Sequence, residues 1–154
     1  MYNRTIGPFF FNEATITADV YRNLLTEYVA PQLIDLQPTI IFQQDGAPPH
    51  WGRHVRQFLN QTFPDRWIGR DEPIPWPPRS PDITPLDFFL WGYVKDIVYQ
   101  TKIRDIADLR QRIRNAIATV DEAILQRTLQ ETEYRLDVLR ATNGAHIEVY
   151  KITV

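Results

Sequence analysis

Residues 40–54 read IIFQQDGAPPHWGRH, an apolar run that ends abruptly in two glutamines, an aspartate, a glycine and two prolines. The apolar part predicts a short buried strand over Thr39 to Phe42, introduced by Pro38. Asp45 would then follow the carboxyl end of a strand, which is where ligands gather in open α/β sheets. A carboxylate at that place can bind a hard cation such as Mg²⁺. The alternative is a plain turn residue, because Asp-Gly is a common turn pair.

The segments on either side of this stretch predict an α/β order. Residues 6–11, IGPFFF, are typical of a short aromatic strand, and Thr17 to Val29 is typical of a helix capped by Thr17. Arg53 to Phe63 predicts a second helix, and residues 66–68 a further short strand. A sheet of so few strands seldom covers a core. We therefore expect a small mixed sheet flanked by helices, in which the first strand or strands are missing or come from another chain.

A proline-rich stretch divides the chain. Residues 72–85, EPIPWPPRSPDITP, hold six prolines in fourteen residues, a density that excludes a helix and indicates a rigid extended connector. Thr84 suits an N-cap and Pro85 the first position of the helix that follows. Two more helices are predicted, capped by Asp105 and starting near Asp121, and residues 144–152 are expected to form a strand or an ordered tail.

Composition bounds the classes of protein that this chain can represent. Its 154 residues fit a single domain, 1–154, and 44% are hydrophobic, which is enough to build a core. There is no cysteine, so disulfides, zinc–thiolate sites and thiol nucleophiles are excluded. We see no apolar run of the roughly 20 residues that a membrane helix needs and no signal peptide, so we expect no membrane partner.

The charge distribution leaves a nucleic-acid interface open. The net charge of −2 gives no global argument for it, but residues 95–114 carry six Lys/Arg against three acids. Residues 121–137 carry two Arg against five acids. The basic stretch would either face phosphates or be an ordinary solvated helix face.

Asp87 is the second candidate carboxylate, three residues into the helix that Thr84 and Pro85 begin. It is separated from Asp45 by 41 residues, so that only folding could bring the two together. A strand-end and a helix-start carboxylate sharing Mg²⁺ is how a two-metal phosphoryl-transfer site is built. Alternatively, Asp87 is the third-position acid of a capping box with Thr84. Asp82 is a competing ligand that a turn after Pro81 explains equally well.

Other polar and aromatic residues near the candidate site have two readings each. His50 and His54 have a spacing that could bind zinc, but no third ligand is evident, which favours polar surface roles. The four tryptophans could stack on bases or pack in the core. Several basic residues flank the site and could bind phosphates or simply be solvated. The candidates for nucleic-acid binding are His50, Arg53, Arg79, Lys95, Lys102 and Arg104.

Three blocks in this order resemble a known family: IIFQQDGAPPH, FPDRWIGR and PWPPRSPDITPLDFFLWGYVKDIVY. They are similar to the catalytic domain of mariner-like DNA transposases, which belong to the DDE/DDD superfamily and have an RNase H-like fold. The resemblance runs from about Ile6 to Glu148. In such enzymes three acids hold two Mg²⁺ (or Mn²⁺) ions, which serve cleavage and joining of transposon-end DNA.

The resemblance implies roles for individual residues. Asp45 matches the second catalytic acid and Asp87 the third, both as metal ligands, while Asp82 matches an accompanying motif residue. The first acid of the family lies upstream of the segment matching residues 6–11, so we expect it to be absent here, with Glu13 and Asp19 as poor substitutes.

An incomplete site implies weak or absent metal binding and no activity of the chain alone. The alternative is a non-catalytic DNA- or protein-binding module derived from a transposase. Either reading implies a nuclear location and permits a homodimer.

Overall fold

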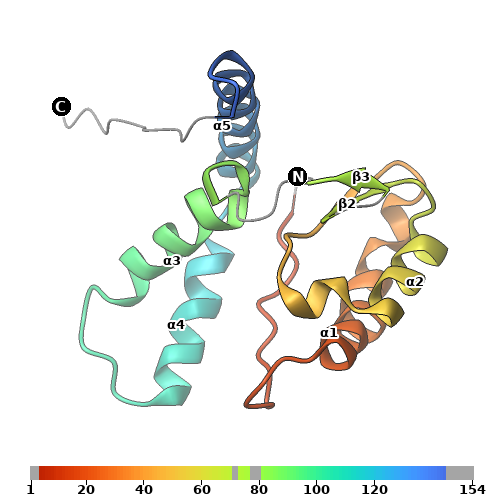
Figure 1. Cartoon of the computed structure of the whole chain (residues 1–154). Helices are drawn as coiled ribbons and strands as arrows, with labels where there is room; N and C mark the ends of the chain where they lie inside the picture. The colour runs from red at the N-terminus through yellow and green to blue at the C-terminus, as the bar shows by residue number, and fades with distance from the viewer. Residues whose placement is uncertain (1–3, 71–72, 77–80, 145–154) are drawn as a thin grey trace. The chain divides into compact units, whose positions relative to one another are not determined.

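The computed structural model describes residues 4–70, 73–76 and 81–144 (Figure 1). The chain divides into two compact units. One consists of Phe9–Ser80, and the other of Met1–Pro8 with Pro81–Val154. None of the helices in the described ranges combines the length and the apolar character needed to span a bilayer.

The first helical region of the Phe9–Ser80 unit is longer than predicted. Helix α1, Ala18–Leu24, starts after Thr17, whose side chain accepts a hydrogen bond from the Val20 N–H at 3.3 Å. The chain continues as a π-helical segment, Leu25–Val29, and a 3₁₀ helix, Ala30–Leu36. The predicted cap is thus confirmed, but Pro31 does not end the helical path. Proline is tolerated there because it lies in the first turn of the 3₁₀ segment, where its missing N–H has no helical partner to lose.

A three-stranded parallel sheet lies in the same unit. Strand β1 is Phe42–Gln43, β2 is Trp67–Gly69 and β3 is Ile74–Pro75, in the order β1-β2-β3. Phe42 pairs with Trp67, and Ile68 with Ile74. Helix α2, Arg53–Thr62, links β1 to β2 as the crossover of a βαβ unit. The prediction of a small sheet flanked by helices is confirmed, but the described sheet is all parallel and not mixed. The strand predicted at residues 66–68 is also confirmed, displaced by one residue.

Two strand predictions are wrong in detail. Residues 6–11 form no strand in the described structure; Phe9 packs instead against Phe11 and Tyr28, with ring centroids 5.1 Å apart in each pair. The strand predicted at Thr39 to Phe42 begins only at Phe42, because the Thr39 N–H donates to the Leu36 carbonyl in a turn. It is not buried either, since Ile41 is 58% exposed.

The predicted proline connector also differs from expectation. Residues 74–75 pair with β2 as β3, at the edge of the sheet, where a proline is permitted because it need not donate to a ladder. Residues 71–72 and 77–80 lie outside the described structure. Residues 74–75 are therefore extended, as expected, but they belong to the sheet. At the other end of the predicted connector, Pro81–Ile83 form a 3₁₀ turn rather than an extended segment.

The core of the Phe9–Ser80 unit forms around α2 and β2. Val55, Leu59, Phe63 and Trp67 are all at most 1% exposed, and Phe42 stacks on Phe63 with ring centroids 5.3 Å apart. The starts of α1 and α2 meet at Gly52, where a β-carbon would collide with Ala18. This packing fixes β1 against α2, and β1 leads directly into the QQDGAPPH segment.

The described part of the second unit consists of helical segments joined by loops. A 3₁₀ turn, Pro81–Ile83, precedes Pro85 at the first helical position and a π-helical segment, Leu86–Leu90, which runs into α3, Trp91–Val98. Figure 1 shows α3 beside α4, Ile106–Ala118. Val94 and Val98 of α3 pack with Ala116 and Ile117 of α4 in one apolar cluster.

The last two helices begin where their caps predict. Asp105 accepts a hydrogen bond from the Asp108 N–H at 2.8 Å at the start of α4. Asp121 accepts one from the Ile124 N–H at 2.8 Å at the start of α5, Glu122–Ala141. The predicted cap at Asp105 and the predicted helix start near Asp121 are confirmed. Of the strand or tail predicted at 144–152, residues 145–152 lie outside the described structure.

Part of the basic stretch 95–114 has a structural task. The Arg112 guanidinium donates to the carbonyls of Val98, Thr101 and Lys102 at 2.9–3.1 Å and contacts Asp108 at 3.1 Å, closing the loop between α3 and α4. Two hydrogen bonds to its carboxylate lower the pKa of Asp108 to about 2: that from the Arg104 N–H has the larger effect, and that from the Arg112 side chain the smaller. Arg112 is therefore occupied inside the protein rather than available to phosphates.

Candidate functional site

Asp45 lies two residues beyond β1, and its side chain is 48% exposed. Its Oδ1 atom accepts a hydrogen bond from the Ala47 N–H at 3.0 Å. The Nδ1 atom of His50 lies 2.6 Å from the same oxygen but without hydrogen-bond alignment, so the contact is an ion pair when the imidazole carries a proton. Among the described residues, no hydrogen bond or ion pair involves Oδ2 of Asp45. One carboxylate oxygen is thus held, and the other makes none of these contacts in the described structure.

The Asp45–Ala47 hydrogen bond also bears on the turn alternative. A side-chain oxygen that accepts from the backbone two residues on is the Asx-turn expected of Asp-Gly. The bond uses Oδ1 alone. Asp45 therefore shapes the turn and still presents a carboxylate oxygen.

A buried polar network packs against the turn that begins at Asp45. The Tyr21 hydroxyl donates to Oε1 of Gln44 at 3.2 Å, and Nε2 of Gln44 donates to the His50 carbonyl at 3.0 Å. The rings of Tyr21 and His50 face each other with centroids 4.0 Å apart. Tyr21 is 9% exposed and Gln44 5%. Helix α1 is thereby tied to the loop that carries Asp45.

Asp87 lies in the other unit, at the second residue of the π-helical segment, with an exposed side chain. Its N–H donates to the Thr84 carbonyl at 2.9 Å, and the Phe88 N–H donates to the same oxygen at 3.1 Å. The Thr84 carbonyl thus accepts the first bonds of this helical segment, as the predicted cap requires. Asp45 and Asp87 each follow the element boundary that the sequence predicts for them.

Arg135 of α5 contacts residues on both sides of this helix start, Asp82 before it and Phe88 after it. Its side chain donates to the Asp82 carbonyl at 2.9 Å and to Oε1 of Glu131 at 2.7 Å. Its guanidinium carbon lies 4.4 Å from the centre of the Phe88 ring. Arg135 is only 9% exposed, so these contacts form in a largely dry environment. Asp87 stands between the two segments that Arg135 touches.

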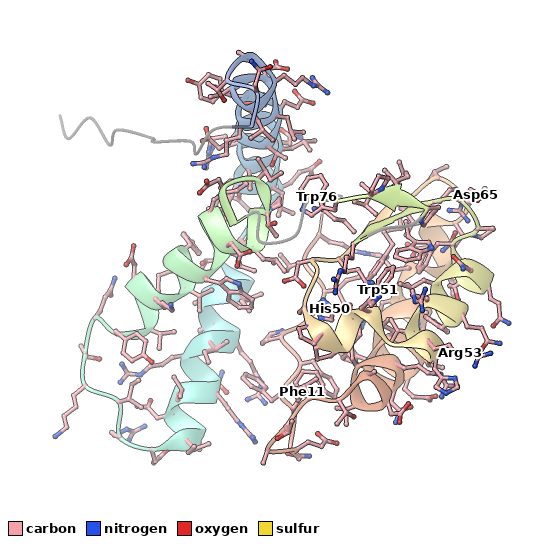
Figure 2. The ribbon with its side chains drawn as sticks, in the orientation of Figure 1. Phe11, His50, Trp51, Arg53, Asp65 and Trp76 are labelled. Carbon is pink, nitrogen blue, oxygen red and sulfur yellow. The ribbon has the colours of Figure 1, made fainter. Side chains whose placement is uncertain are left out.

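Two arginines contact the ring of Trp51, which is labelled near His50 in Figure 2. The guanidinium carbons of Arg56 and Arg70 lie 4.4 and 5.8 Å from the centre of the Trp51 ring. Arg53, labelled in the figure at the start of α2, is exposed. The Nε atom of Arg56 is buried and has no hydrogen-bond partner in the described structure. We call Trp51, Arg56 and Arg70 the Trp51 cluster.

The remaining nucleic-acid candidates have different surroundings. Lys95 and Lys102 are exposed in the second unit. Arg104 is 79% exposed at its side chain and lies 3.5 Å from Asp108. Arg79 lies outside the described residues. Within the described residues, no group of three or more His, Cys, Asp or Glu side chains could hold a metal ion.

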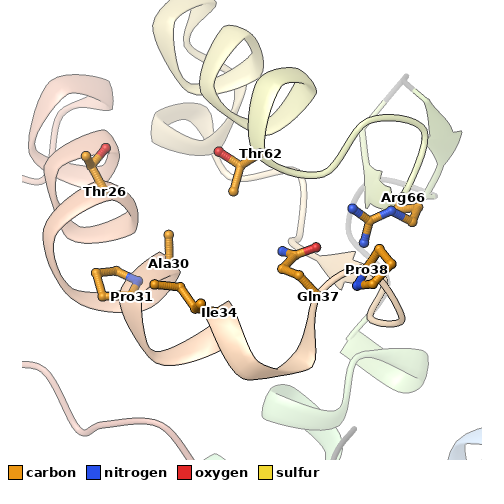
Figure 3. A pocket seen from close by; sticks show the side chains of 8 residues that line it. All are labelled: Thr26, Ala30, Pro31, Ile34, Gln37, Pro38, Thr62 and Arg66. Atoms are coloured by element: carbon orange, nitrogen blue, oxygen red, sulfur yellow. The ribbon is translucent and has the colours of Figure 1, made fainter.

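A pocket of about 520 Å³ opens elsewhere in the Phe9–Ser80 unit (Figure 3). Its walls come from the helical path of residues 26–38 and from Thr62 and Arg66 beyond it. Oε1 of Gln37 is buried there without a hydrogen-bond partner among the described residues. None of the predicted site residues lines this pocket.

Sequence reasoning missed the residues that support the two acids. The sequence pattern does not distinguish Tyr21 from other core residues of its helix. Gln44 stands where an apolar run ends, and Arg135 is one of two arginines in the acidic stretch 121–137. In each case the functional partner is remote in sequence, by 23 residues for Tyr21 and Gln44 and by 53 for Arg135 and Asp82.

No family model matches the chain. It is 31% identical over 105 residues to the Tc3 transposase of Caenorhabditis elegans, a match that covers 67% of this chain and 30% of that protein. The chain thus spans less than a third of the length of this relative.

Solved structures agree in fold. Structures of the Mos1 transposase catalytic domain with Mn and with Mg match 87% of this chain and 66% of theirs, at 21% identity and TM-scores of 0.72 and 0.71. The Mos1 paired-end complex with the left transposon end matches at a TM-score of 0.72 and 23% identity, over 87% of this chain and 38% of the other. The sequence match and the shared RNase H-like fold together place this chain among the mariner-like transposases, as a homologue of part of their catalytic domain.

Proposed function

We propose that this chain contributes to metal-dependent cleavage and joining of DNA strands, with Asp45 and Asp87 each supplying a carboxylate ligand. The observation that carries the proposal is Asp45: it follows a parallel strand, and one of its oxygens is held while the other is uncontacted in the described structure. The similarity to Tc3 transposase supports the reaction class.

The residues present fit a divalent cation of the hard type. Asp45 and Asp87 offer exposed carboxylate oxygens, the donor that Mg²⁺ and Mn²⁺ prefer. Mos1, which shares the fold, has been solved with both metals. When bound, such ions supply activation of the attacking oxygen and stabilisation of the leaving oxygen of a phosphodiester.

The side chains around the acids have supporting roles in this proposal. His50 and the Ala47 N–H hold one oxygen of Asp45, which limits its rotation. Arg135 fixes the segments that flank Asp87. We infer a nuclear location, where the DNA substrate lies, and a dimer that brings two DNA ends together, in line with the paired-end complex of Mos1.

We expect the 154-residue chain alone to cleave DNA weakly or not at all. The resemblance assigns two acids to it, whereas the mariner-like family uses three. A single carboxylate ligand binds such a cation with low affinity. Metal binding is therefore a better first test than catalysis.

The direct test is Mn²⁺ binding, followed by paramagnetic broadening of backbone amide signals. Wild-type chain should show broadening at residues 45–47 and near 87, and Asp45→Asn or Asp87→Asn should weaken binding at its own position roughly 10-fold or more, as expected for the loss of a charged ligand. Plasmid nicking in Mn²⁺, run beside it, should stay near background in all three proteins.

Two substitutions serve as matched controls. Asp65→Asn removes an exposed carboxylate from the Phe9–Ser80 unit, and Asp96→Asn removes one from α3. Both should leave Mn²⁺ broadening unchanged. Equal broadening in Asp45→Asn and Asp65→Asn would refute the ligand role of Asp45, and strong nicking by the wild type would refute the inactivity of the isolated chain.

A second candidate function is DNA binding without catalysis, favoured by the Trp51 cluster. Two guanidiniums lie over one indole, and the Nε of Arg56 has no partner among the described residues. Arg53, one residue beyond Gly52, adds a further exposed cation. The positive charge of these side chains would attract a phosphate backbone, with sequence-independent and salt-dependent binding.

We expect Arg53→Gln with Arg56→Gln to weaken binding of a duplex oligonucleotide and to reduce the slope of log Kobs against log[salt] by about 1 for each phosphate contact removed. Fluorescence anisotropy at several salt concentrations measures both. Arg22→Gln, which removes an exposed arginine from α1 in the same unit, is the control and should change neither. An unchanged slope in the double variant would exclude this surface as the phosphate contact.

A further inference from the structure

The Asp45 loop is held by a chain of contacts that starts on another helix. Tyr21 of α1 donates to Gln44, Gln44 donates to the His50 carbonyl, and the His50 ring lies between the Tyr21 ring and Asp45. The series of contacts that passes through Gln44 therefore ends at Asp45, the next residue in the sequence. A closed set of contacts of this kind fixes several torsions of the 44–50 segment at once.

The hydrogen bonds of Gln44 leave little freedom in how it is oriented. The His50 carbonyl can only accept, so the amide nitrogen of Gln44 must face it. The amide oxygen then faces Tyr21, whose hydroxyl must be the donor. Burial of the phenol raises the pKa of Tyr21, and the nearby negative charge of Asp45 raises it further. The hydroxyl therefore keeps its proton at neutral pH. Each donor in the network therefore has a single suitable acceptor.

The network acts on one oxygen of Asp45. His50 Nδ1 and the Ala47 N–H both meet Oδ1, so the position of the imidazole helps to decide how the carboxylate is rotated. The hydrogen bond to the His50 carbonyl and the stacking on Tyr21 in turn decide where the imidazole lies. Without the hydroxyl of Tyr21, the amide of Gln44 would lose one of its two partners, and the 48–51 turn would gain freedom.

We propose that Tyr21 and Gln44 are positioning residues for the Asp45 carboxylate, which hold the turn Pro48–Trp51 so that His50 contacts Oδ1 and leaves Oδ2 for a cation. The role in metal binding rests on the proposed function, whereas the role in orienting the carboxylate stands on the contacts alone. Neither residue touches the cation or the DNA in this proposal.

The test uses the full chain and Tyr21→Phe, which deletes the hydroxyl and keeps the ring that stacks on His50. The first readout needs no metal: the chemical shift and hydrogen exchange of the Ala47 amide report its bond to Asp45, and Asp45→Ala gives the fully released end point. We expect the Tyr21→Phe signal to move toward that end point. We also expect the Kd for Mn²⁺ to rise roughly 3–10-fold, the ratio that one lost hydrogen bond produces.

Tyr28→Phe is the matched control, because it removes a tyrosine hydroxyl from the same helical path. The ring of Tyr28, which the variant keeps, packs on Phe9. The variant should leave the Ala47 amide and the Mn²⁺ affinity unchanged. If Tyr21→Phe does not fold, Gln44→Met removes the bond to Tyr21 together with the bond to the His50 carbonyl, at similar volume, and should shift the Ala47 signal likewise.

The outcomes separate this inference from the proposed function. An Ala47 amide that is identical in the wild type and in Tyr21→Phe or Gln44→Met overturns the positioning role, whatever the metal does. A shifted Ala47 amide in a chain whose wild type shows no Mn²⁺ broadening near Asp45 supports the positioning role and refutes the ligand role. Both effects together support both.

Discussion

Replacing Arg135 with alanine is expected to destabilise the chain by about 2–4 kcal/mol, because hydrogen bonds to a charged group contribute about 1.5–3 kcal/mol and a partly desolvated cation–π contact about 0.5–2 kcal/mol. The side chain is 9% exposed and bonds the Asp82 carbonyl and Glu131 while lying over Phe88. Its loss leaves the Asp82 carbonyl without this donor. Urea unfolding followed by circular dichroism measures the change in free energy.

Arg127→Ala is the matched control, an exposed arginine on the same helix, and it should cost less than about 0.5 kcal/mol. Arg135→Lys should fall between the two, because an ammonium group keeps the charge but lacks the planar fork that reaches two acceptors. The Asp87 amide should shift in Arg135→Ala and stay in Arg127→Ala. Equal stability of the two alanine variants would show that Arg135 does not anchor the SPDITP segment.

The helix starts could be predicted because their determinants are local. Thr17, Asp105 and Asp121 each accept a bond from an N–H three residues on, so the signal lies within one turn of sequence. Strands differ, because a strand exists only with a partner. Residues 6–11 have the composition of a strand but no ladder in the described structure. Thr39 is held in a turn by the Leu36 carbonyl, so the predicted strand cannot begin there.

The candidate site divides in the same way. Asp45 could be identified since a carboxylate just past an apolar run is a local pattern, and the loop chemistry QDGAPPH supports it. Its support could not be identified, because Tyr21 reaches Gln44 across 23 residues and Arg135 reaches Asp82 across 53. The basic stretch misleads for a related reason: its net charge is visible in sequence, but the carbonyls that engage Arg112 are not.

Trp67→Ala should have the largest effect on stability, about 3–5 kcal/mol, the usual cost of deleting a buried aromatic side chain. Trp67 is fully buried, pairs with Phe42 across β1 and β2, and donates from Nε1 to Asn60 at 2.8 Å. Its ring also lies where a β-carbon on Gly69 would be. The deletion thus opens a cavity under the strand pair that leads to Asp45.

Companion variants divide this cost into its parts. Asn60→Ala, which removes only the hydrogen-bond acceptor, should cost about 0.5–1.5 kcal/mol, and Gly69→Ala, which pushes a methyl group into the ring, about 1–3 kcal/mol. Trp91→Ala, at a tryptophan that is 47% exposed on α3, is the control and should cost about 1 kcal/mol or less. Urea unfolding ranks all four. Equal losses for Trp67→Ala and Trp91→Ala would contradict a central role of Trp67 in the core around β2. The predicted ranking would support that role, and with it the dependence of β1, and of the backbone that carries Asp45, on this side chain.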